Sequence, residues 1–391
     1  MPEVGGESHV SQNRRDVGHP IPALSSPALI RMLFAGIPFT ICFRQPATRE
    51  FLLTAQNPIS VAVVGVGVFG RNHARVYKEL EQQGESVRLL GVVDPDLNRA
   101  DAVASEFGCK GFGSVQQMLT THSELQAASV AAPTLHHLSV AGELMKAGVD
   151  VLIEKPLAAT LAEAEQLVAL AAKHKRIAQV GHLERFNPAV RATVPLLTQP
   201  MFFEVHRLSV FTPRSLDVDV VLDLMIHDLD IVLAFAKSPV KEVRAVGLPI
   251  LSGKVDIANV RLEFESGCIA NFTASRVSTE RVRKLRFFQP RQYVSLDYGR
   301  QEVLVFTVGQ DGASATPSVN PQIGVTKPPV ASEEPLHAEL KSFLRAVRER
   351  STPVVPLEDG RRALALALEI VAAIRDHGAK VDLAGIAKTK H

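Results

Sequence analysis

Residues 61–70 read VAVVGVGVFG, and a helix-forming stretch follows over residues 71–80. The apolar residues are typical of a β-strand, and Gly65, Gly67 and Gly70 have the spacing G-x-G-x-x-G. Gly65 would let the chain leave the strand in a tight turn, Gly67 would let the backbone approach a pyrophosphate, and Gly70 would let the helix pack close to the strand. The first N–H groups of the helix would then face the phosphates. The stretch therefore predicts a dinucleotide-binding strand, turn and helix.

A second strand supports this prediction. Residues 91–95 read GVVDP, and Asp94 lies 24 residues beyond Gly70. An acid at this distance would hold the ribose hydroxyls of NAD and would repel the 2′-phosphate of NADP. Val68 and Phe69, between the glycines, are expected to lie beside the same cofactor, NAD.

The composition is that of an ordinary soluble globular protein. A chain of 391 residues leaves room for two domains, and 46% hydrophobic with 21% charged residues is a usual balance. A net charge of +2 gives no reason to expect nucleic acid as a partner. Three cysteines, Cys42, Cys109 and Cys268, are too few and too scattered for a disulfide framework or a zinc site. We therefore expect a cytoplasmic protein without a metal.

The first 57 residues differ from the rest of the chain. Residues 1–28 are rich in Gly, Ser and Pro and show no periodicity, which indicates disorder. The apolar run at 29–43 is interrupted by Arg31 and Pro38 and is too short to span a bilayer. It would also be an unusual signal-peptide core, because a polar leader precedes it. We expect residues 1–57 to be a dispensable extension and the membrane not to be a partner.

Residues 58–181 predict an NAD-binding Rossmann domain of the α/β class, with a doubly wound parallel sheet. Helices are expected at 136–147 and 161–174, and the loops after the strands would surround one crevice. The expected strands are 60–66, 87–93, 127–132, 149–154 and 177–181.

Residues 182–335 predict a second, α+β domain with a large open mixed or antiparallel sheet, for substrate binding and oligomerisation. One helix, 219–236, interrupts its strands, and 309–335 is expected to be a long loop. In the last segment, 336–391, two amphipathic helices would pack back on the fold. The expected strands are 201–212, 241–251, 256–265, 267–277, 282–288, 292–298 and 301–308.

Two stretches at predicted strand ends carry candidate site residues. One strand ends in Glu154-Lys155-Pro156, and the proline restricts Lys155 to an extended backbone, which fixes the direction of its side chain. The other reads Ala132-Pro133-Thr134, with His137 at the start of the next helix. A lysine that only caps a strand and a histidine that only caps a helix are the alternative interpretations.

The helix at 219–236 contains Asp223, His227 and Asp230 at positions i, i+4 and i+7. This spacing would place two carboxylates beside an imidazole, orienting the ring and fixing its tautomer. A metal site and an exposed polar stripe are the alternatives. No cluster of His or Cys accompanies the three residues, and their neighbours are almost wholly apolar, so the pattern favours a functional site.

Taken together, these motifs resemble those of the Gfo/Idh/MocA family of NAD(P)-dependent sugar and inositol oxidoreductases, over about residues 60–375. The resemblance implies that Lys155 contacts the nicotinamide ribose and the reacting hydroxyl, and that Asp223 and His227 flank the substrate, with His227 as general base. One face of the second sheet would close the site, and the other would build a homodimer or homotetramer. The cofactor set would comprise Gly65, Gly67, Val68, Phe69, Gly70, Asp94, Ala132, Pro133, Thr134, His137, Glu154 and Lys155.

Residues 179–189, QVGHLERFNPA, resemble the branch of this family that oxidises UDP-linked N-acetylhexosamines at C3. Arg185 and Asn187 would lie beside the sugar. A basic run that includes Arg276 and Arg283 would meet the diphosphate, unless it is only a solvated strand edge.

The sequence therefore predicts NAD-dependent oxidation of the C3 hydroxyl of a UDP-N-acetylglucosamine-type sugar. The resemblance further implies that an aminotransferase acts on the 3-keto product, in amino-sugar synthesis for lipid A or polysaccharide. A free-sugar or inositol dehydrogenase is one alternative. A nucleotide-sensing regulator on the same fold is the other, which Lys155, Asp223 and His227 argue against.

Overall fold

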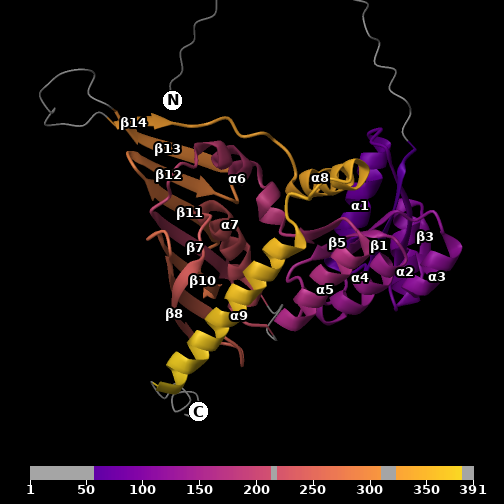
Figure 1. Cartoon of the computed structure of the whole chain (residues 1–391), viewed down its shortest axis with the longest axis horizontal. Coiled ribbons are helices and arrows are strands. Elements are labelled where there is room, and N and C mark those ends of the chain that lie inside the picture. The colour runs from indigo at the N-terminus through magenta and orange to yellow at the C-terminus, as the bar shows by residue number, and fades with distance from the viewer. Residues whose placement is uncertain (1–56, 213–217, 310–322, 381–391) are drawn as a thin grey trace, which may run out of the picture. The chain divides into compact units, whose positions relative to one another are not determined.

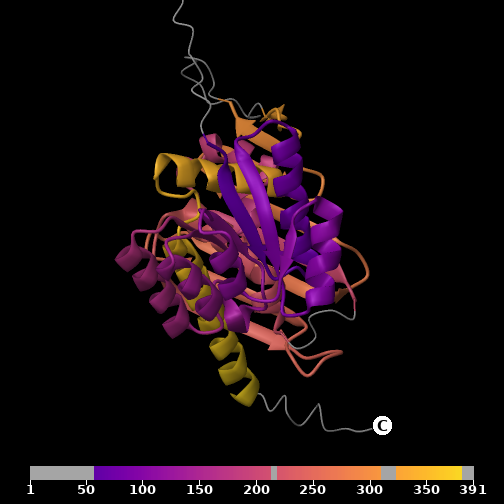
Figure 2. The same ribbon diagram turned by 90° about the vertical axis from the view of Figure 1, so that its right-hand side faces the viewer.

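The computed structural model describes residues 57–212, 218–309 and 323–380, so almost the whole predicted extension, 1–57, lies outside them. In these ranges the strands form two sheets (Figures 1 and 2). The first has six parallel strands in the order β3-β2-β1-β4-β5-β6, and the second has eight in the order β14-β13-β12-β11-β7-β10-β9-β8. No helix in the described part of the chain has the length and apolar character needed to cross a bilayer.

The six-stranded sheet is the predicted doubly wound Rossmann sheet. Figure 2 shows helices on both of its faces. One apolar cluster packs under α1, α2 and α8, and the other under α3, α4 and α5. Its elements are β1 (Ile59–Val64), α1 (Val68–Gln82), β2 (Val87–Val93), α2 (Leu97–Phe107), β3 (Lys110–Phe112), α3 (Val115–Thr121), β4 (Ala127–Val130), α4 (His137–Lys146), β5 (Asp150–Glu154), α5 (Leu161–His174) and β6 (Ala178–Gly181).

The five expected strands of this half are confirmed, and the structure adds β3, which the sequence analysis did not find. With three residues, β3 is too short to show an alternating pattern. Helix α5 begins as expected, because Thr160 Oγ1 accepts the backbone N–H of Glu163 at 3.2 Å. Gly148 follows α4 with a φ of +88°, which a glycine adopts without strain.

The glycine-rich turn has the predicted local geometry at two positions. Gly65 has a φ of +84°, and a Cβ there would lie 2.5 Å from the backbone nitrogen of Ala132. A Cβ on Gly70 would lie 1.7 Å from the carbonyl oxygen of Gly65, so α1 packs against the turn more closely than any side chain allows. The turn and the close helix packing are therefore both built on glycine.

The second half of the chain forms the eight-stranded sheet. All its neighbouring strands are antiparallel except β7 and β10, which are parallel. Its elements are α6 (Pro188–Thr193), β7 (Phe202–Val210), a π-helical turn (Val221–Met225), α7 (Ile226–Ala236), β8 (Val240–Leu248), β9 (Ile257–Phe264), β10 (Ile269–Ser278), β11 (Val282–Gln289), β12 (Gln292–Asp297), β13 (Glu302–Val308) and β14 (Ile323–Thr326).

Two expectations for this half are wrong. Residues 309–335 are not all loop, because β14 pairs with β13 inside that range. Its four residues are exposed, so no buried face marks it in the sequence. The helix expected at 219–236 is also not a single α-helix, because a π-helical turn precedes α7.

The two C-terminal helices are amphipathic, as expected. In α8 (Pro335–Glu349), the four predicted apolar positions Leu340, Phe343, Leu344 and Val347 are buried in the cluster that also holds α1. In α9 (Leu357–Lys380), Ile374 packs in the core of the large sheet. Figure 1 shows α9 crossing the face of the eight-stranded sheet on which α7 also lies.

Gly70→Ala should lower the free energy of unfolding by about 1–3 kcal/mol, because the new methyl overlaps the Gly65 carbonyl. Gly67→Ala is the matched control, since no heavy atom of the described chain lies within 4 Å of a Cβ built there. It should leave thermal stability unchanged and weaken NAD binding, because the methyl enters the space expected for the pyrophosphate. Thermal melts and an NAD titration separate the two effects. Equal melting temperatures for both variants would contradict this account of Gly70.

Candidate active site

Lys155 connects the two sheets. It follows Glu154, the last residue of β5, and its Nζ donates a hydrogen bond to the carbonyl oxygen of Asp223 at 3.0 Å. The same Nζ lies 3.9 Å from Asp223 Oδ1, and the lysine side chain is 16% exposed. Burial lowers the pKa of Lys155, while the negative charges of Asp223 and Glu154 act in the opposite direction. The structure thus brings together Lys155 and Asp223, which are 68 residues apart in the sequence.

Asp223 lies in the π-helical turn, and His227 lies in the first turn of α7. A π-helix pairs residues five apart, so the i, i+4 spacing does not align side chains as in an α-helix. No hydrogen bond within the described residues joins the His227 ring to Asp223 or to Asp230. Asp230 instead accepts two hydrogen bonds from Arg185, at 2.6 and 2.8 Å. In the described chain, neither carboxylate is hydrogen-bonded to the imidazole, and Asp230 is engaged by Arg185.

The surroundings of His227 favour a neutral ring. Burial lowers its pKa well below the ordinary value, and the positive charges of Lys155 and Arg207 lower it further. Its Nδ1 is buried without a hydrogen-bond partner in the described chain. A neutral imidazole near a buried ammonium can accept a proton, which is what a general base requires.

A cavity of about 740 Å³ opens beside Lys155. The loops at the carboxyl ends of β4 and β5 line one side, and the segment that begins the π-helical turn lines the other. His227 is not among its lining residues in the described chain. They are Pro133, Thr134, Leu135, Lys155, Pro156, Ala158, Ala159, Val218, Asp219, Leu222, Asp223, Lys254 and Leu364.

Lys254 is a cavity residue that the sequence analysis missed, since a lysine in a turn between two strands carries no signal. The turn is fixed by Asp256, whose Oδ2 accepts the backbone N–H groups of Ile250, Leu251 and Ser252 at 2.6–2.8 Å. Burial of Asp256 acts against ionisation, but these hydrogen bonds lower its pKa to about 2. The backbone of the turn that carries Lys254 is therefore fixed at the cavity wall.

The surroundings of the glycine-rich turn are suited to bind the pyrophosphate of NAD. No side chain caps the N-terminus of α1, so its first N–H groups are available to a phosphate. Val68 and Phe69 there are 64% and 57% exposed. Asp94 is buried, and its carboxylate accepts the backbone N–H groups of Val66 and Asp96, each at 3.0 Å. It thus holds the glycine-rich turn, and its ribose contact stays a prediction.

The other predicted cofactor residues divide into two groups. Pro133 and Thr134 line the cavity, whereas His137 is buried. The His137 ring lies between carbonyl oxygens, with Nε2 2.9 Å from that of Ala132 and Nδ1 3.1 Å from that of Pro156. It connects the loops after β4 and β5. The position of His137 supports a role in holding these two loops of the expected NAD site together.

The four predicted substrate residues differ in their surroundings. Asn187 is buried and caps α6, and its amide donates to the carbonyl oxygen of Tyr298 at 3.1 Å. Arg185 is paired with Asp230, and Arg276 is buried with a hydrogen bond to the carbonyl oxygen of Val218. Arg283 is exposed, and no ion pair holds it in the described chain.

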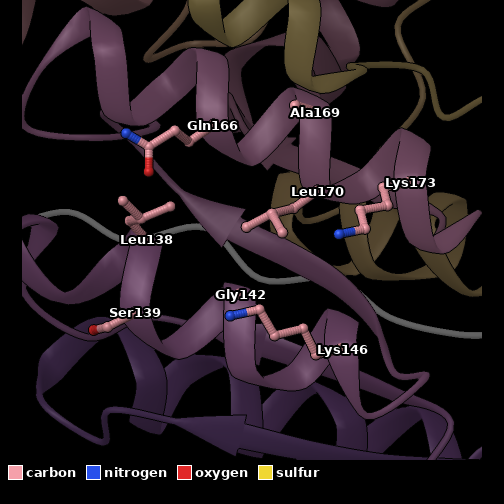
Figure 3. A pocket seen from close by; sticks show the side chains of 8 residues that line it. All are labelled: Leu138, Ser139, Gly142, Lys146, Gln166, Ala169, Leu170 and Lys173. Carbon is pink, nitrogen blue, oxygen red and sulfur yellow. The ribbon is translucent and has the colours of Figure 1, made fainter.

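A second pocket, of about 430 Å³, lies between α4 and α5 (Figure 3). Leu138 and Leu170 contribute its apolar surface, and Lys146 and Lys173 lie at one side. It contains none of the predicted site residues in the described chain. Of the predicted site residues, Pro133, Thr134, Lys155 and Asp223 line the cavity beside Lys155, and Arg185 lines a further pocket of about 190 Å³.

The parallel sheet, the glycine-rich turn and a buried lysine facing a second sheet define an NAD-binding oxidoreductase. Residues 59–182 match the oxidoreductase family with an NAD-binding Rossmann fold, and residues 199–293 match the GFO/IDH/MocA C-terminal domain. The chain therefore belongs to the Gfo/Idh/MocA family, and it is an NAD-dependent enzyme that acts on a CH–OH group.

Among its relatives is the UDP-N-acetylglucosamine 3-dehydrogenase of Acidithiobacillus ferrooxidans, 36% identical over 80% of this chain and 96% of the relative. The solved structure of that enzyme superimposes with a TM-score of 0.73 at 34% identity, over 81% of this chain and 98% of that one. The scyllo-inositol 2-dehydrogenase (NAD⁺) of Bacillus subtilis is 26% identical, over 57% of this chain and 69% of the relative.

Lys155→Ala and His227→Ala should each lower kcat at least about a hundredfold, the lower range for a positioned proton-transfer group. Because the pKa of His227 is lowered, the wild-type rate of oxidation should stay level as pH falls from 7 through the ordinary imidazole range, and should drop only below it. Steady-state kinetics from pH 5 to 9 measure both effects. Near-normal turnover by either variant would show that the site is assigned incorrectly.

Proposed function

We propose that the protein oxidises the C3 hydroxyl of a UDP-N-acetylglucosamine-type nucleotide sugar, with NAD as hydride acceptor, and releases a 3-keto sugar. Supporting this is Arg283, which has no ion-pair partner among the described residues, together with the similarity to an enzyme that carries the name of this reaction. When bound, NAD supplies the hydride acceptor that oxidation of a secondary alcohol needs. His227 would take the hydroxyl proton, and Lys155 would stabilise the developing alkoxide. Asp223, which holds the Lys155 ammonium, would orient it.

The position of Arg283 supports a diphosphate contact. Across the pair β7 and β11 it lies opposite Arg207. Arg207 is buried and neutralised by Asp228, at 2.6 and 2.9 Å, and by Glu184, at 3.1 Å. Arg283 has no such partner in the described residues. Part of its side chain is accessible to solvent, and the burial of the remainder, together with the charge of Arg207, lowers its pKa. An anionic ligand would relieve this repulsion, as a phosphate does with a guanidinium.

The face of the large sheet on which Arg283 lies also favours a contact with the substrate. Leu285 and Phe287, two and four residues further along β11, are buried on the face that packs against α7. Strand side chains alternate, so Arg283 shares that inner face. Lys254 would add a second cation from the cavity wall. A free hexose or inositol would need neither charge, which separates this proposal from the inositol dehydrogenases among the relatives.

The product suggests the next reaction. A 3-keto sugar is a substrate for an aminotransferase, so we place the protein in amino-sugar synthesis for lipid A or polysaccharide. NAD and nucleotide sugars are cytoplasmic metabolites, and we propose that compartment.

UDP-N-acetylglucosamine should be oxidised with NAD, and N-acetylglucosamine without UDP should be a poor substrate in both kcat and KM. Binding energy from the nucleotide is available to orient the reacting carbon, so its removal affects both constants. NADH formation is measured on both sugars, coupled to transamination to remove the keto product. Turnover of inositol or glucose, with none of any UDP-sugar, would overturn the proposal.

Arg283→Ala tests the diphosphate contact in the same assay. It should raise KM for the UDP-sugar about tenfold or more, because a hydrogen bond to a charged group contributes roughly 1.5–3 kcal/mol. Arg286→Ala is the matched control, since Arg286 pairs with Glu204 at 2.9 Å on the opposite face of the same strand. Equal effects of the two variants on KM would remove Arg283 from the substrate site.

We also propose that the outer face of the large sheet joins two or four copies of the chain. Phe288 is stacked on Tyr293, and Tyr293 on Phe306, with ring centroids 4.8 and 5.1 Å apart. Phe288 is 39% exposed, and an aromatic ladder of this kind is typical of an interface. Light scattering should give the mass of a dimer or tetramer, and Phe288→Asp should shift it to the monomer. A monomeric wild-type protein at micromolar concentration would contradict this.

A further inference from the structure

Three ionisable side chains meet in the interior behind Lys155, on the face of the Rossmann sheet that α1 and α8 cover. They are His73 from α1, Glu154 from β5 and Glu339 from α8. His73 Nε2 lies 3.0 Å from Glu154 Oε1, and polar atoms of all three residues lie within 4.8 Å of one another. His73 and Glu339 are both 0% exposed.

Glu339 is the member of this cluster without a counter-charge. Both its carboxylate oxygens are buried, and neither has a hydrogen-bond partner in the described chain. The imidazole of the cluster, His73, is hydrogen-bonded to Glu154, and the neighbouring Lys155 ammonium is bound to Asp223. An ionised carboxylate buried next to another carboxylate is very costly, so Glu339 needs a proton or a cation.

Two further buried polar side chains of the described chain, Tyr77 and Gln179, supply no positive charge. From α1, the hydroxyl of Tyr77 lies 3.0 Å from Ser129 Oγ of β4, and burial raises the pKa of Tyr77. From β6, Gln179 is buried, and its amide is also without a partner in the described residues. Burial and the charge of Glu154 together raise the pKa of Glu339 well above its usual value.

The surroundings of the His73 ring favour a proton over a metal ion in this cluster. A histidine that ligates a metal usually donates its other ring N–H to an acceptor, which fixes the ring. His73 Nδ1 is buried and has no such acceptor among the described residues. The cluster thus offers three potential metal ligands, one imidazole and two carboxylates, but lacks the support that a ligating histidine receives.

We propose that Glu339 is a neutral carboxylic acid whose proton faces the Glu154 carboxylate, and that it is a positioning residue for Lys155. The connection runs through Glu154, whose Oε1 lies beside His73 and whose Oε2 accepts the backbone N–H of Lys155 at 3.3 Å. The inference rests on the proposed role of Lys155 in the reaction. Through it, the C-terminal helix α8 contributes to a site that it does not line in the described chain.

The test compares Glu339→Gln, which keeps a neutral group of the same shape, with Glu339→Ala. The Ala variant should lower kcat about tenfold or more, since a misplaced reacting group is costly, with little change in KM for the sugar. The Gln variant should keep kcat within about twofold of wild type. The glutamine amide, like the proposed carboxylic acid, is a neutral group that can donate a hydrogen bond to Glu154. Glu349→Gln, an exposed position at the end of the same helix, is the control.

An infrared difference spectrum, wild type minus Glu339→Gln at neutral pH, tests the proton itself without any substrate or turnover. It should contain the C=O band of a carboxylic acid and no carboxylate bands. Carboxylate bands, a stoichiometric divalent metal lost in Glu339→Gln, or equal loss of kcat in the Gln and Ala variants would each overturn the proposal. The spectrum does not depend on the sugar, so its failure is distinguishable from failure of the proposed function.

Discussion

One lysine joins the two sheets at the cavity. Lys155 follows a buried parallel strand, and its ammonium donates to the backbone carbonyl of Asp223 at 3.0 Å. An ammonium taken out of water needs acceptors, and this one finds its acceptor in the other half of the chain. The contact places the π-helical turn, and with it the start of α7, beside the strand end. Neither sheet can form this cavity alone, because each supplies one of its sides.

Buried ion pairs hold the rest of the junction in register. Arg185 binds Asp230 of α7, and Glu184 accepts from Arg207 of β7. Removing one partner of such a pair leaves an uncompensated buried charge, which is strongly destabilising. The segment after β6, which resembles the nucleotide-sugar branch, therefore fixes how α7 meets the Rossmann sheet. Its charged residues stabilise the junction, whereas Arg283 is left for the proposed diphosphate contact.

Much of the fold and part of the candidate site could be predicted from local patterns in the sequence. The glycine spacing, the apolar strands and the motif at Lys155 indicated the fold and the place of the lysine at a strand end, because each depends on neighbours in the sequence. The π-helical turn at Asp223 was not predictable, since the apolar pattern of that helix continues through it. Lys254 lies in a turn whose position is fixed by Asp256. The partners of Arg185 and Arg276 depend on the tertiary fold, so they could not be inferred from the sequence. Glu339 did leave a signal, an acid on the apolar stripe of α8.

We propose that the enzyme oxidises the C3 hydroxyl of a nucleotide sugar bound in the cavity beside Lys155. The most direct measurement uses UDP-N-acetylglucosamine deuterated at C3, incubated with the protein and NAD, followed by mass spectrometry of both products. Deuterium should be found in the reduced nicotinamide and be absent from the keto sugar, and the deuterated substrate should react more slowly in the hydride-transfer step. Deuterium retained in an oxidised sugar would contradict the account, because another carbon would then have reacted.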